Sequence, residues 1–500
     1  MGSDVVPAPF RQHERAGNYF LIGVLLDMLG NRALAARFHA ASVALDGSRA
    51  DAHHRLGRSL EAIGDLAGAI AAYCEAVRRC PGKADYYVDI SSALSNAGRF
   101  EPARIAAGIA VRLDPRCAEG FNNLGHALLN LNRSGEALAP YEQAIALRQY
   151  YPRAQFGYAV ALLKSGDFDR GWKQYEWRWQ DCQRPRADFA VPVWRGEDLR
   201  DRTILLHAEQ GFGDTLQFVR FAPMVAARGG RVVLEVPAPL VRLLRGVEGV
   251  AQIIARGDPM PPVDLQCPMA SLPLAFGLQL KKIPARAYLP VPQAGDAAEA
   301  VAPWDRRAFP AGRRDMVVGL VWAGDPRVSE LRSNLVDRRR SARLDMFAPL
   351  FGVGGVRFVS FQFGGARAQI ADATMPIADA MEGVTDFADT AARLAGIDLL
   401  ISVDTSIVHL AGGLGHPVWM LSRFDGCWRW LEGRDRTPWY PTMRIFRQPA
   451  PGDWAGLMAV IAKRLQARAR RFRLNGAGAP TRPTGAADGR AKTALPKADR

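Results

Sequence analysis

The sequence predicts an all-α repeat array followed by two doubly wound parallel α/β sheets. Glycine returns every 34 residues through the first third of the chain. From residue 203 onwards, short apolar runs alternate with helix-like segments, and a Pro-, Ala- and Asp-rich stretch around residues 290–315 separates two such cycles. A fixed period indicates stacked repeats, and strands that alternate with helices indicate parallel sheets.

Two sets of residues, which we call columns, recur at intervals of 34 positions. The turn column holds Gly30, Gly64, Gly98, Asn132 and Gly166, and the small-residue column holds Ala35, Ala69, Ala103, Ala137 and Gly171. Within one unit, residues 50–83, apolar positions recur at helical spacing on both sides of the glycine, so each unit is expected to be a helix-turn-helix hairpin. This pattern resembles the tetratricopeptide repeat. It predicts five repeats over residues 16–185 after an N-terminal extension, residues 1–15.

Composition indicates a globular protein whose excess charge is concentrated at one end. The chain has 500 residues, 48% of them hydrophobic and 23% charged, and a net charge of +15. Nine of those net positive charges lie in residues 463–500. Residues 471–500 are therefore expected to form a disordered basic tail. Since no interleaved aromatic and basic motif is present, the charge does not indicate a specific nucleic-acid partner.

The chain carries no sequence signal for secretion or for crossing a membrane. Its first residues lack a basic segment leading into an apolar one, and no apolar run reaches the length of about 18 residues that a bilayer requires. A cytoplasmic location is therefore expected. The six cysteines have no CxxC spacing, so neither a zinc site nor a disulfide framework is predicted.

The first predicted α/β lobe covers residues 186–296. Its expected strands are Thr203–His207, Arg231–Val236, residues 251–254 and residues 264–267, with helices over residues 215–227 and 239–244. A glycine turn, Gly211-Phe-Gly213, follows the first strand directly. A short turn of this kind occurs after strands in many nucleotide-binding sheets.

The second predicted lobe covers residues 297–470. Its expected strands are residues 316–322, 357–361, 397–403 and 418–421, and its expected helices are residues 387–395, 405–413 and 454–468. A cleft between two such sheets is a natural place for a ligand.

The strongest local motif begins where the strand over residues 397–403 ends. This strand delivers Asp404, Thr405 and Ser406 to its carboxyl end, where they can cap the next helix and leave backbone N–H groups for an anion. His409 follows Thr405 by about one helical turn, so both side chains can face one ligand. The alternative is that Asp404 or Thr405 is only an N-cap and His409 a hydrogen-bonded core histidine.

These motifs resemble a known family of enzymes. Residues 207–218 (His-Ala-Glu-Gln-Gly-Phe-Gly-Asp-Thr-Leu-Gln-Phe), 318–324 (Val-Gly-Leu-Val-Trp-Ala-Gly) and 403–412 (Val-Asp-Thr-Ser-Ile-Val-His-Leu-Ala-Gly) carry the resemblance. The span from Trp194 to Leu465 is similar to the C-terminal region of bacterial tetratricopeptide-repeat proteins whose glycosyltransferase module resembles the heptosyltransferase family. The resemblance implies a two-domain fold of the GT-B type that uses a nucleotide sugar, with no bound metal and no other cofactor.

The resemblance also implies roles for individual residues. Asp214 would be the general base that takes the proton of an acceptor hydroxyl, a role that depends first on geometry, and its alternative is a helix N-cap. Asp404, Thr405 and His409 would hold the diphosphate and its neighbouring sugar, and Ser406 stands where the family commonly has glycine. The predicted catalytic residues are thus Asp214 and His409, and the predicted substrate-binding residues are Glu209, Gln210, Gly211, Gly213, Asp404, Thr405, Ser406, Arg339 and Arg340.

The two arginines come from a segment rich in that residue, residues 327–343. A diphosphate leaving group needs a cation nearby, and Arg339 or Arg340, just before Ser341, is the predicted one. The alternative is a solvated basic loop.

Three functions are compatible with these patterns. The first is a metal-independent glycosyltransferase whose repeats recruit a protein or glycan acceptor. The second is a scaffold in which the repeats bind peptide partners and the sheets are a vestigial module. The third is a dinucleotide-dependent oxidoreductase, which is disfavoured because no acidic residue follows a complete GxGxxG in the first βαβ unit.

Overall fold

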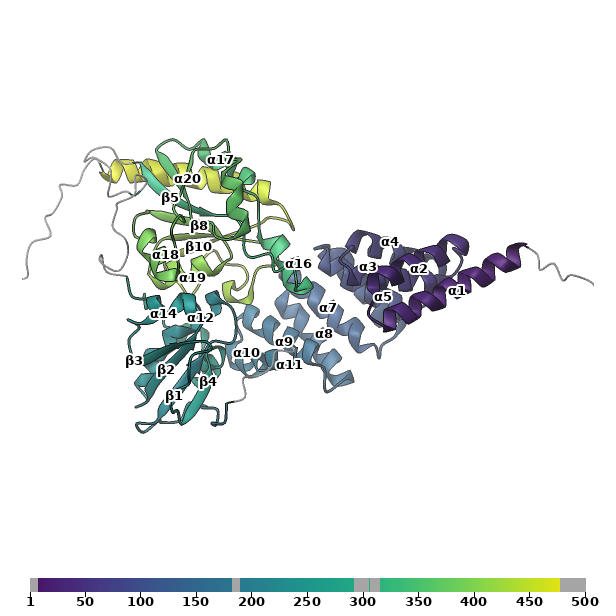
Figure 1. Ribbon diagram of the computed structural model, residues 1–500, viewed down its shortest axis with the longest axis horizontal. Helices are drawn as coiled ribbons and strands as arrows, with labels where there is room; N and C mark the ends of the chain where they lie inside the picture. Colours follow the sequence, from purple (N-terminus) through teal and green to yellow (C-terminus); the bar gives the residue numbers. More distant parts are fainter. Residues whose placement is uncertain (1–7, 182–188, 292–304, 306–314, 477–500) are drawn as a thin grey trace, which may run out of the picture.

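The computed structural model describes residues 8–181, 189–291, 305 and 315–476. The predicted linker around residues 290–315 and residues 477–500 of the predicted tail lie almost wholly outside this range. A helical array projects to one side of the molecule, and two parallel sheets with their helices form the other side (Figure 1).

Within the described residues, ten helices pair into five hairpins, which confirms the predicted repeat units. The pairs are α1 (Ala8–Met28) with α2 (Arg32–Leu45), α3 (Ala50–Ala62) with α4 (Leu66–Arg79), α5 (Ala84–Asn96) with α6 (Phe100–Leu113), α7 (Ala118–Asn130) with α8 (Ser134–Leu147), and α9 (Pro152–Ser165) with α10 (Phe168–Tyr175). A short helix, α11 (Arg178–Asp181), follows the last pair. Helix α1 begins inside residues 1–15, which the sequence assigned to an extension outside the repeats.

The turn column is left-handed in every repeat. The φ angles are 79° at Gly30, 86° at Gly64, 75° at Gly98 and 95° at Gly166, and Asn132 has a φ of 58°. Glycine adopts this conformation without steric cost, and asparagine tolerates it better than most residues. Glycine therefore recurs every 34 residues because the same left-handed backbone conformation recurs at that position of each repeat.

Two further glycines, one in α3 and one in α7, allow the two helices of their hairpins to touch. A Cβ placed on Gly57 of α3 would lie 2.6 Å from Cδ1 of Tyr73 on α4, and one placed on Gly125 of α7 would lie 3.0 Å from the ring of Tyr141 on α8. Since real Cβ contacts are longer, a larger residue would separate the helices and open the packed interior.

The first sheet has four parallel strands in the order β3-β2-β1-β4. They are β1 (Thr203–His207), β2 (Arg231–Val236), β3 (Val250–Ala255) and β4 (Leu265–Pro268). The single helix expected over residues 215–227 is broken into α12 (Phe212–Phe218), a 3₁₀ turn and α13 (Ala222–Ala226). Pro223 lies in the first turn of α13, where its missing N–H is tolerated.

The second sheet has six parallel strands in the order β10-β9-β8-β5-β6-β7. They are β5 (Met316–Val321), β6 (Val356–Ser360), β7 (Ile377–Asp379), β8 (Leu399–Val403), β9 (Val418–Ser422) and β10 (Met443–Arg447). Helices α16 (Leu331–Arg340), α18 (Phe387–Leu394) and α19 (Ser406–Gly413) belong to this region. Strands β7 and β10 and helix α16 were absent from the sequence prediction.

The C-terminal helix is longer than the sequence indicated. Helix α20 runs from Trp454 to Gly476 and so extends into the first six residues of the predicted tail. Within the described part of the chain, no helix is long and apolar enough to span a membrane.

One apolar core joins the last repeat to both sheets. It contains Trp172 of α10, Phe218 of α12, and Trp428 and Trp439 from the second sheet region, each of them buried. The rings of Trp172 and Trp428 meet edge to face at 5.3 Å between centroids, and those of Phe218 and Trp439 at 6.3 Å. The repeats and the sheets are therefore packed as one body at this end of the array.

The turn column also makes contact with the sheet region, and we call Gly64, Gly98, Asn132 and Gly166 the docking edge. A Cβ on Gly64 or Gly98 would lie 3.6 Å from Leu331 or Arg339 of α16, and one on Gly166 would lie 3.4 Å from Leu280. The side-chain amide of Asn132 donates to the carbonyl of Phe424 at 2.9 Å. By contrast, a Cβ on Gly30 would meet no atom of the residues that the structure describes within 4 Å.

Asn132 combines a left-handed backbone with a hydrogen bond across the docking edge. Asn132→Ala removes both the bond and the tolerance of this backbone, so we expect it to lower the free energy of unfolding by about 2 kcal/mol. Asn132→Gly removes only the bond and is expected to cost about 1 kcal/mol. Urea titration followed by circular dichroism measures both values. A glycine variant less stable than the alanine variant would contradict this account.

Candidate ligand site between the repeats and the two sheets

The carboxyl ends of the central strands of both sheets face each other across helices α12 and α19, which pack together (Figure 1). Gly213 of α12 makes the close approach possible. A Cβ at this position would lie 2.9 Å from Cδ2 of His409 and 3.5 Å from Cα of Ser406. The structure thus brings the glycine loop after β1 next to the motif after β8, although about 190 residues separate them in the sequence.

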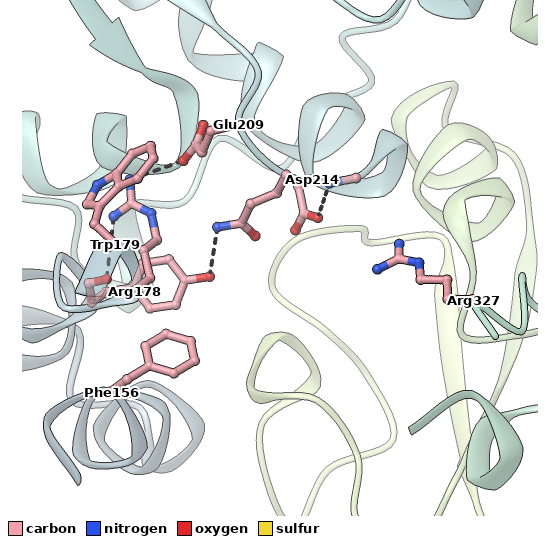
Figure 2. Close-up of a pocket in the computed structure, with 9 residues that line it drawn as sticks. Phe156, Arg178, Trp179, Glu209, Asp214 and Arg327 are labelled. Atoms are coloured by element: carbon pink, nitrogen blue, oxygen red, sulfur yellow. Dashed lines mark hydrogen bonds and ion pairs between the residues drawn. The ribbon is translucent and has the colours of Figure 1, made fainter. Parts of the chain in front are cut away.

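A cavity of about 190 Å³ opens beside this junction. It is lined by Phe156, Tyr175, Arg178, Trp179, Glu209, Gln210, Gly211, Asp214 and Arg327. Figure 2 shows Phe156, Arg178 and Trp179 gathered on the repeat side, with Asp214 and Arg327 towards the second sheet. The cavity therefore has walls from three parts of the chain: the last repeat, the loop after β1 and the loop after β5.

Asp214 lies on the cavity wall and has two partners. Its Oδ2 accepts the backbone N–H of Gly211 at 3.1 Å. Gly211 is the N-cap of α12 and Asp214 is the third residue of that helix, so the alternative that Asp214 is itself an N-cap is wrong. Its Oδ1 forms an ion pair with Arg429, and 25% of its side chain stays exposed. The carboxylate is thus fixed in orientation by the loop and by the second sheet region while it remains accessible from the cavity.

Arg429 is a site residue that the sequence prediction missed. Its side chain is 11% exposed and donates through Nε to Oε1 of Gln217 at 2.6 Å. Burial alone would lower the pKa of Arg429, but the neighbouring Asp214 carboxylate raises that pKa above its ordinary value. Arg429 lies in a short 3₁₀ turn 215 residues from Asp214, so no local spacing could indicate the pair.

Glu209 and Gln210 connect the glycine loop to the last repeat. The Glu209 carboxylate, 8% exposed, lies 3.0 Å from Nη2 of Arg178, and Gln210 donates to the Tyr175 hydroxyl at 3.4 Å. Burial raises the pKa of Glu209 even though Arg178 acts in the opposite direction. Both residues line the cavity, as their predicted contact with a substrate requires, and they also hold the repeats against the first sheet.

The motif after β8 stands beside a tryptophan and an arginine. Asp404 accepts the indole N–H of Trp430 at 2.8 Å, and Thr405 occupies the N-cap position of α19 without a capping hydrogen bond from its side chain. Arg340 donates to the Asp404 carbonyl at 3.5 Å. A Cβ on Gly324 would lie 2.5 Å from Nη2 of Arg340, so this guanidinium lies against the turn after β5. Asp404, Thr405 and Ser406 are half-buried.

His409 lies in the core and does not line the cavity. It is 6% exposed, its Nδ1 lies 2.9 Å from the Tyr440 hydroxyl, and its ring stacks on Trp430 at 5.4 Å. Burial, helped by two nearby guanidinium groups, lowers the pKa of His409 well below 6.5. The expectation that His409 faces the same ligand as Thr405 is therefore corrected: its ring is a neutral packing element between the sheets.

Arg339 is also placed away from the cavity. Its Nε lies 3.2 Å from the buried Asp425 carboxylate, and its Nη1 donates to the carbonyl of Asn96 at 3.4 Å. It therefore joins the repeats to the second sheet region, which corrects its predicted contact with a diphosphate. Arg327, from the same arginine-rich segment, lines the cavity instead. A Cβ on Gly211 would lie 3.7 Å from Nη2 of Arg327.

The neutral state of His409 predicts a pH dependence of stability. Because its folded-state pKa is below the unfolded value of 6.5, its contribution is complete above that pH and is lost as the pH falls below it. Between about pH 6.5 and 5, we expect the wild type to lose up to about 1.4 kcal/mol per pH unit more than His409→Gln. Urea titration across this range measures the difference.

The comparison isolates His409 because other buried histidines are unchanged in the variant. Burial also lowers the pKa values of His39 and His53, and both titrate in the two proteins alike. If the free energy of unfolding had the same slope against pH in the wild type and in His409→Gln, the ring would already be charged or solvated in the folded state.

Comparisons with known proteins identify the repeats. A family profile described as tetratricopeptide repeat matches residues 22–84, 88–152 and 122–176. The chain is 28% identical over 339 residues to the protein FlbA of Caulobacter vibrioides, an alignment that covers 62% of this chain and 54% of FlbA. The chain thus spans about half the length of this curated relative.

Solved structures are similar to part of this chain. The MamA protein is 21% identical with a TM-score of 0.31, over 35% of this chain and 98% of MamA. Pseudomonas aeruginosa pilF is 19% identical with a TM-score of 0.33, over 44% of this chain and 90% of pilF. With the profile match and the five hairpins, the N-terminal region is a tetratricopeptide-repeat array, followed by a region of parallel sheets and helices.

Proposed function

We propose that the chain is a glycosyltransferase that moves a sugar from a nucleotide sugar to the hydroxyl of an acceptor recruited by the repeats. The observation that carries the proposal is the position of Asp214. Its carboxylate lies on a cavity where the carboxyl ends of two parallel sheets meet, which is where ligands bind in open α/β sheets. A repeat array, the class of structure that binds proteins and peptides through extended surfaces, supplies another wall of the same cavity.

The proposed arrangement of lobes follows the GT-B pattern. The four-stranded lobe, over residues 186–296, would present the acceptor side, and the six-stranded lobe, over residues 297–470, would hold the donor. Asp404, Thr405 and Ser406 support this assignment because they stand at the carboxyl end of β8, where α19 begins. Backbone N–H groups at a helix start favour an anion such as a diphosphate.

The reaction assigned to the site is a single displacement. The acceptor oxygen forms a bond to the anomeric carbon while the bond from that carbon to the diphosphate oxygen breaks, and the nucleoside diphosphate leaves with the electron pair. Asp214 takes the proton of the acceptor hydroxyl. Arg340, beside Asp404, and Arg327, on the cavity wall, supply positive charge where the leaving group develops negative charge.

Two other residues have positioning roles in this proposal. Arg429 holds the Asp214 carboxylate from the side of the second sheet, so a catalytic group of one lobe is oriented by a residue of the other. His409 fills the space beside Gly213 with its neutral ring. Both residues contact groups of the opposite lobe, and neither is assigned a contact with the substrate.

A second candidate is a repeat scaffold whose sheets have no catalytic activity. It is favoured by the partners that Asp214 already has, since both carboxylate oxygens are engaged, one by Gly211 and one by Arg429. The tetratricopeptide repeats support protein or peptide partners under either candidate.

Asp214→Asn separates catalysis from capping, because the amide oxygen can still accept the Gly211 N–H while the base is lost. We expect turnover of the reactive nucleotide sugar to fall at least about 100-fold. Asp258→Asn is the matched control, since Asp258 accepts the N–H of Ala255 three residues earlier at 2.9 Å and is not among the residues that line the cavity. Donor hydrolysis and transfer by purified protein measure the effect.

The outcomes separate the two candidates. Equal turnover in the wild type and both variants would remove Asp214 from the mechanism. Calorimetry that detects no affinity for uridine, guanosine or adenosine diphosphate sugars would favour the scaffold.

A further inference from the structure

We propose that the last tetratricopeptide repeat forms the acceptor subsite itself, and that its occupant is a peptide segment that presents a serine or threonine hydroxyl to Asp214. This inference rests on the proposed function and narrows it. The repeats would then complete the active site directly, in addition to recruiting a partner elsewhere on their surface.

The repeat side of the cavity is an aromatic wall with a buried cation. The rings of Phe156 on α9 and Tyr175 on α10 lie 5.6 Å apart between centroids. The Arg178 guanidinium lies 4.8 Å from the Trp179 ring and 5.3 Å from the Tyr175 ring. Such contacts between cations and aromatic faces are attractive, so the wall is formed before any ligand arrives.

Arg178 is held from several directions, which makes the wall rigid. Its side chain is only 4% exposed, and its Nη2 donates to Oγ of Ser271 at 2.7 Å and to Glu209 at 3.0 Å. Glu176 forms a further ion pair with it at 2.5 Å. A preformed wall loses little conformational entropy when a ligand binds.

The aromatic wall and the proposed base belong to one small space. Gln210 links the wall to the glycine loop through the Tyr175 hydroxyl, and Asp214 lines the same cavity four residues later. The volume of about 190 Å³ is below the range of about 300–1,000 Å³ that is usual for pockets of drug-sized ligands. The space therefore suits one residue of a larger partner, and not a whole nucleotide sugar.

Two observations favour a peptide over a glycan as that partner. The wall is formed by α9, α10 and α11, the helices that end the repeat array, and stacked repeats offer extended partners a continuous surface. A sugar would stack on ring faces, but Arg178 already lies over Trp179 and Tyr175. Among peptide side chains, serine and threonine carry the aliphatic hydroxyl that the displacement at Asp214 consumes.

The test uses the full chain and an array of twelve-residue peptides, half of them with serine or threonine and half with alanine in its place. We expect Trp179→Ala to weaken peptide binding about tenfold, and Phe156→Leu to weaken it in the same direction. Tyr150→Ala is the control, because Tyr150 is 69% exposed and pairs with Trp177 outside the cavity. It should bind as the wild type does. Circular dichroism confirms that each variant is folded.

Hydrolysis of the nucleotide sugar without peptide is measured beside binding. In Tyr150→Ala it should match the wild type. In Trp179→Ala sugar transfer should be lost, and in the wild type transfer should require the hydroxyl-containing peptides. Two results would overturn the inference: peptide binding that does not depend on Trp179 and Phe156, or Trp179-dependent binding to a glycan array in place of peptides. If the protein still turns over the donor in those cases, the proposed function is upheld. No donor turnover in any protein, with peptide binding that still depends on Trp179, would overturn the proposed function and leave the peptide subsite in place.

Discussion

The left-handed turn at the end of each hairpin's first helix is the constraint on which the rest of the structure depends. It reverses the chain within two or three residues, so that the helices of a hairpin can touch, and it places a glycine, or in the fourth repeat an asparagine, at the same edge of every repeat. Repeats two to five use that edge against α16, the loop after β9 and the first lobe. Without such compact turns, α10 and α11 would not reach the loop that carries Asp214.

Polar contacts fix the register of this docking. Lys164 of α9 is 3% exposed, donates to the carbonyl of Leu129 at 3.0 Å and lies 3.6 Å from the Glu432 carboxylate. The hydroxyl of Ser134 donates to the same carboxylate. A buried charge without its partner is strongly destabilising, so these groups disfavour any other docked position of the repeats against the sheet region. The apolar core around Trp172 adds an attraction that has no directional preference.

The sequence predicted the parts of this architecture that are encoded locally. The turn column is visible because a positive φ restricts the residue type at one position, and β1, β2 and β8 are visible because buried parallel strands are continuous apolar runs. Strand β7 has only three residues, and β10 has two arginines among its five, so neither is a continuous apolar run. Helix α16 has only three apolar residues among its ten, and it meets the docking edge through Leu331 and Arg339.

The site was less predictable because its decisive contacts join distant residues. Gly211, Gly213 and Asp214 could be placed by their motif, but Arg429 pairs with Asp214 only through the packing of the two sheet regions. His409 has helical spacing from Thr405, yet the residues that enclose it, Trp430 and Tyr440, come from a later segment. Arg339 and Arg340 are neighbours in sequence, and the helix directs one towards the repeats and the other towards Asp404.

The free end of the array has a geometric consequence. A Cβ on Gly30 would meet no atom of the described residues within 4 Å. The first repeat projects away from the sheets (Figure 1), whereas the fifth lines the cavity. Each added unit would extend the stack by one fixed step. The number of repeats therefore sets how far the distal tip of the array stands from the cavity.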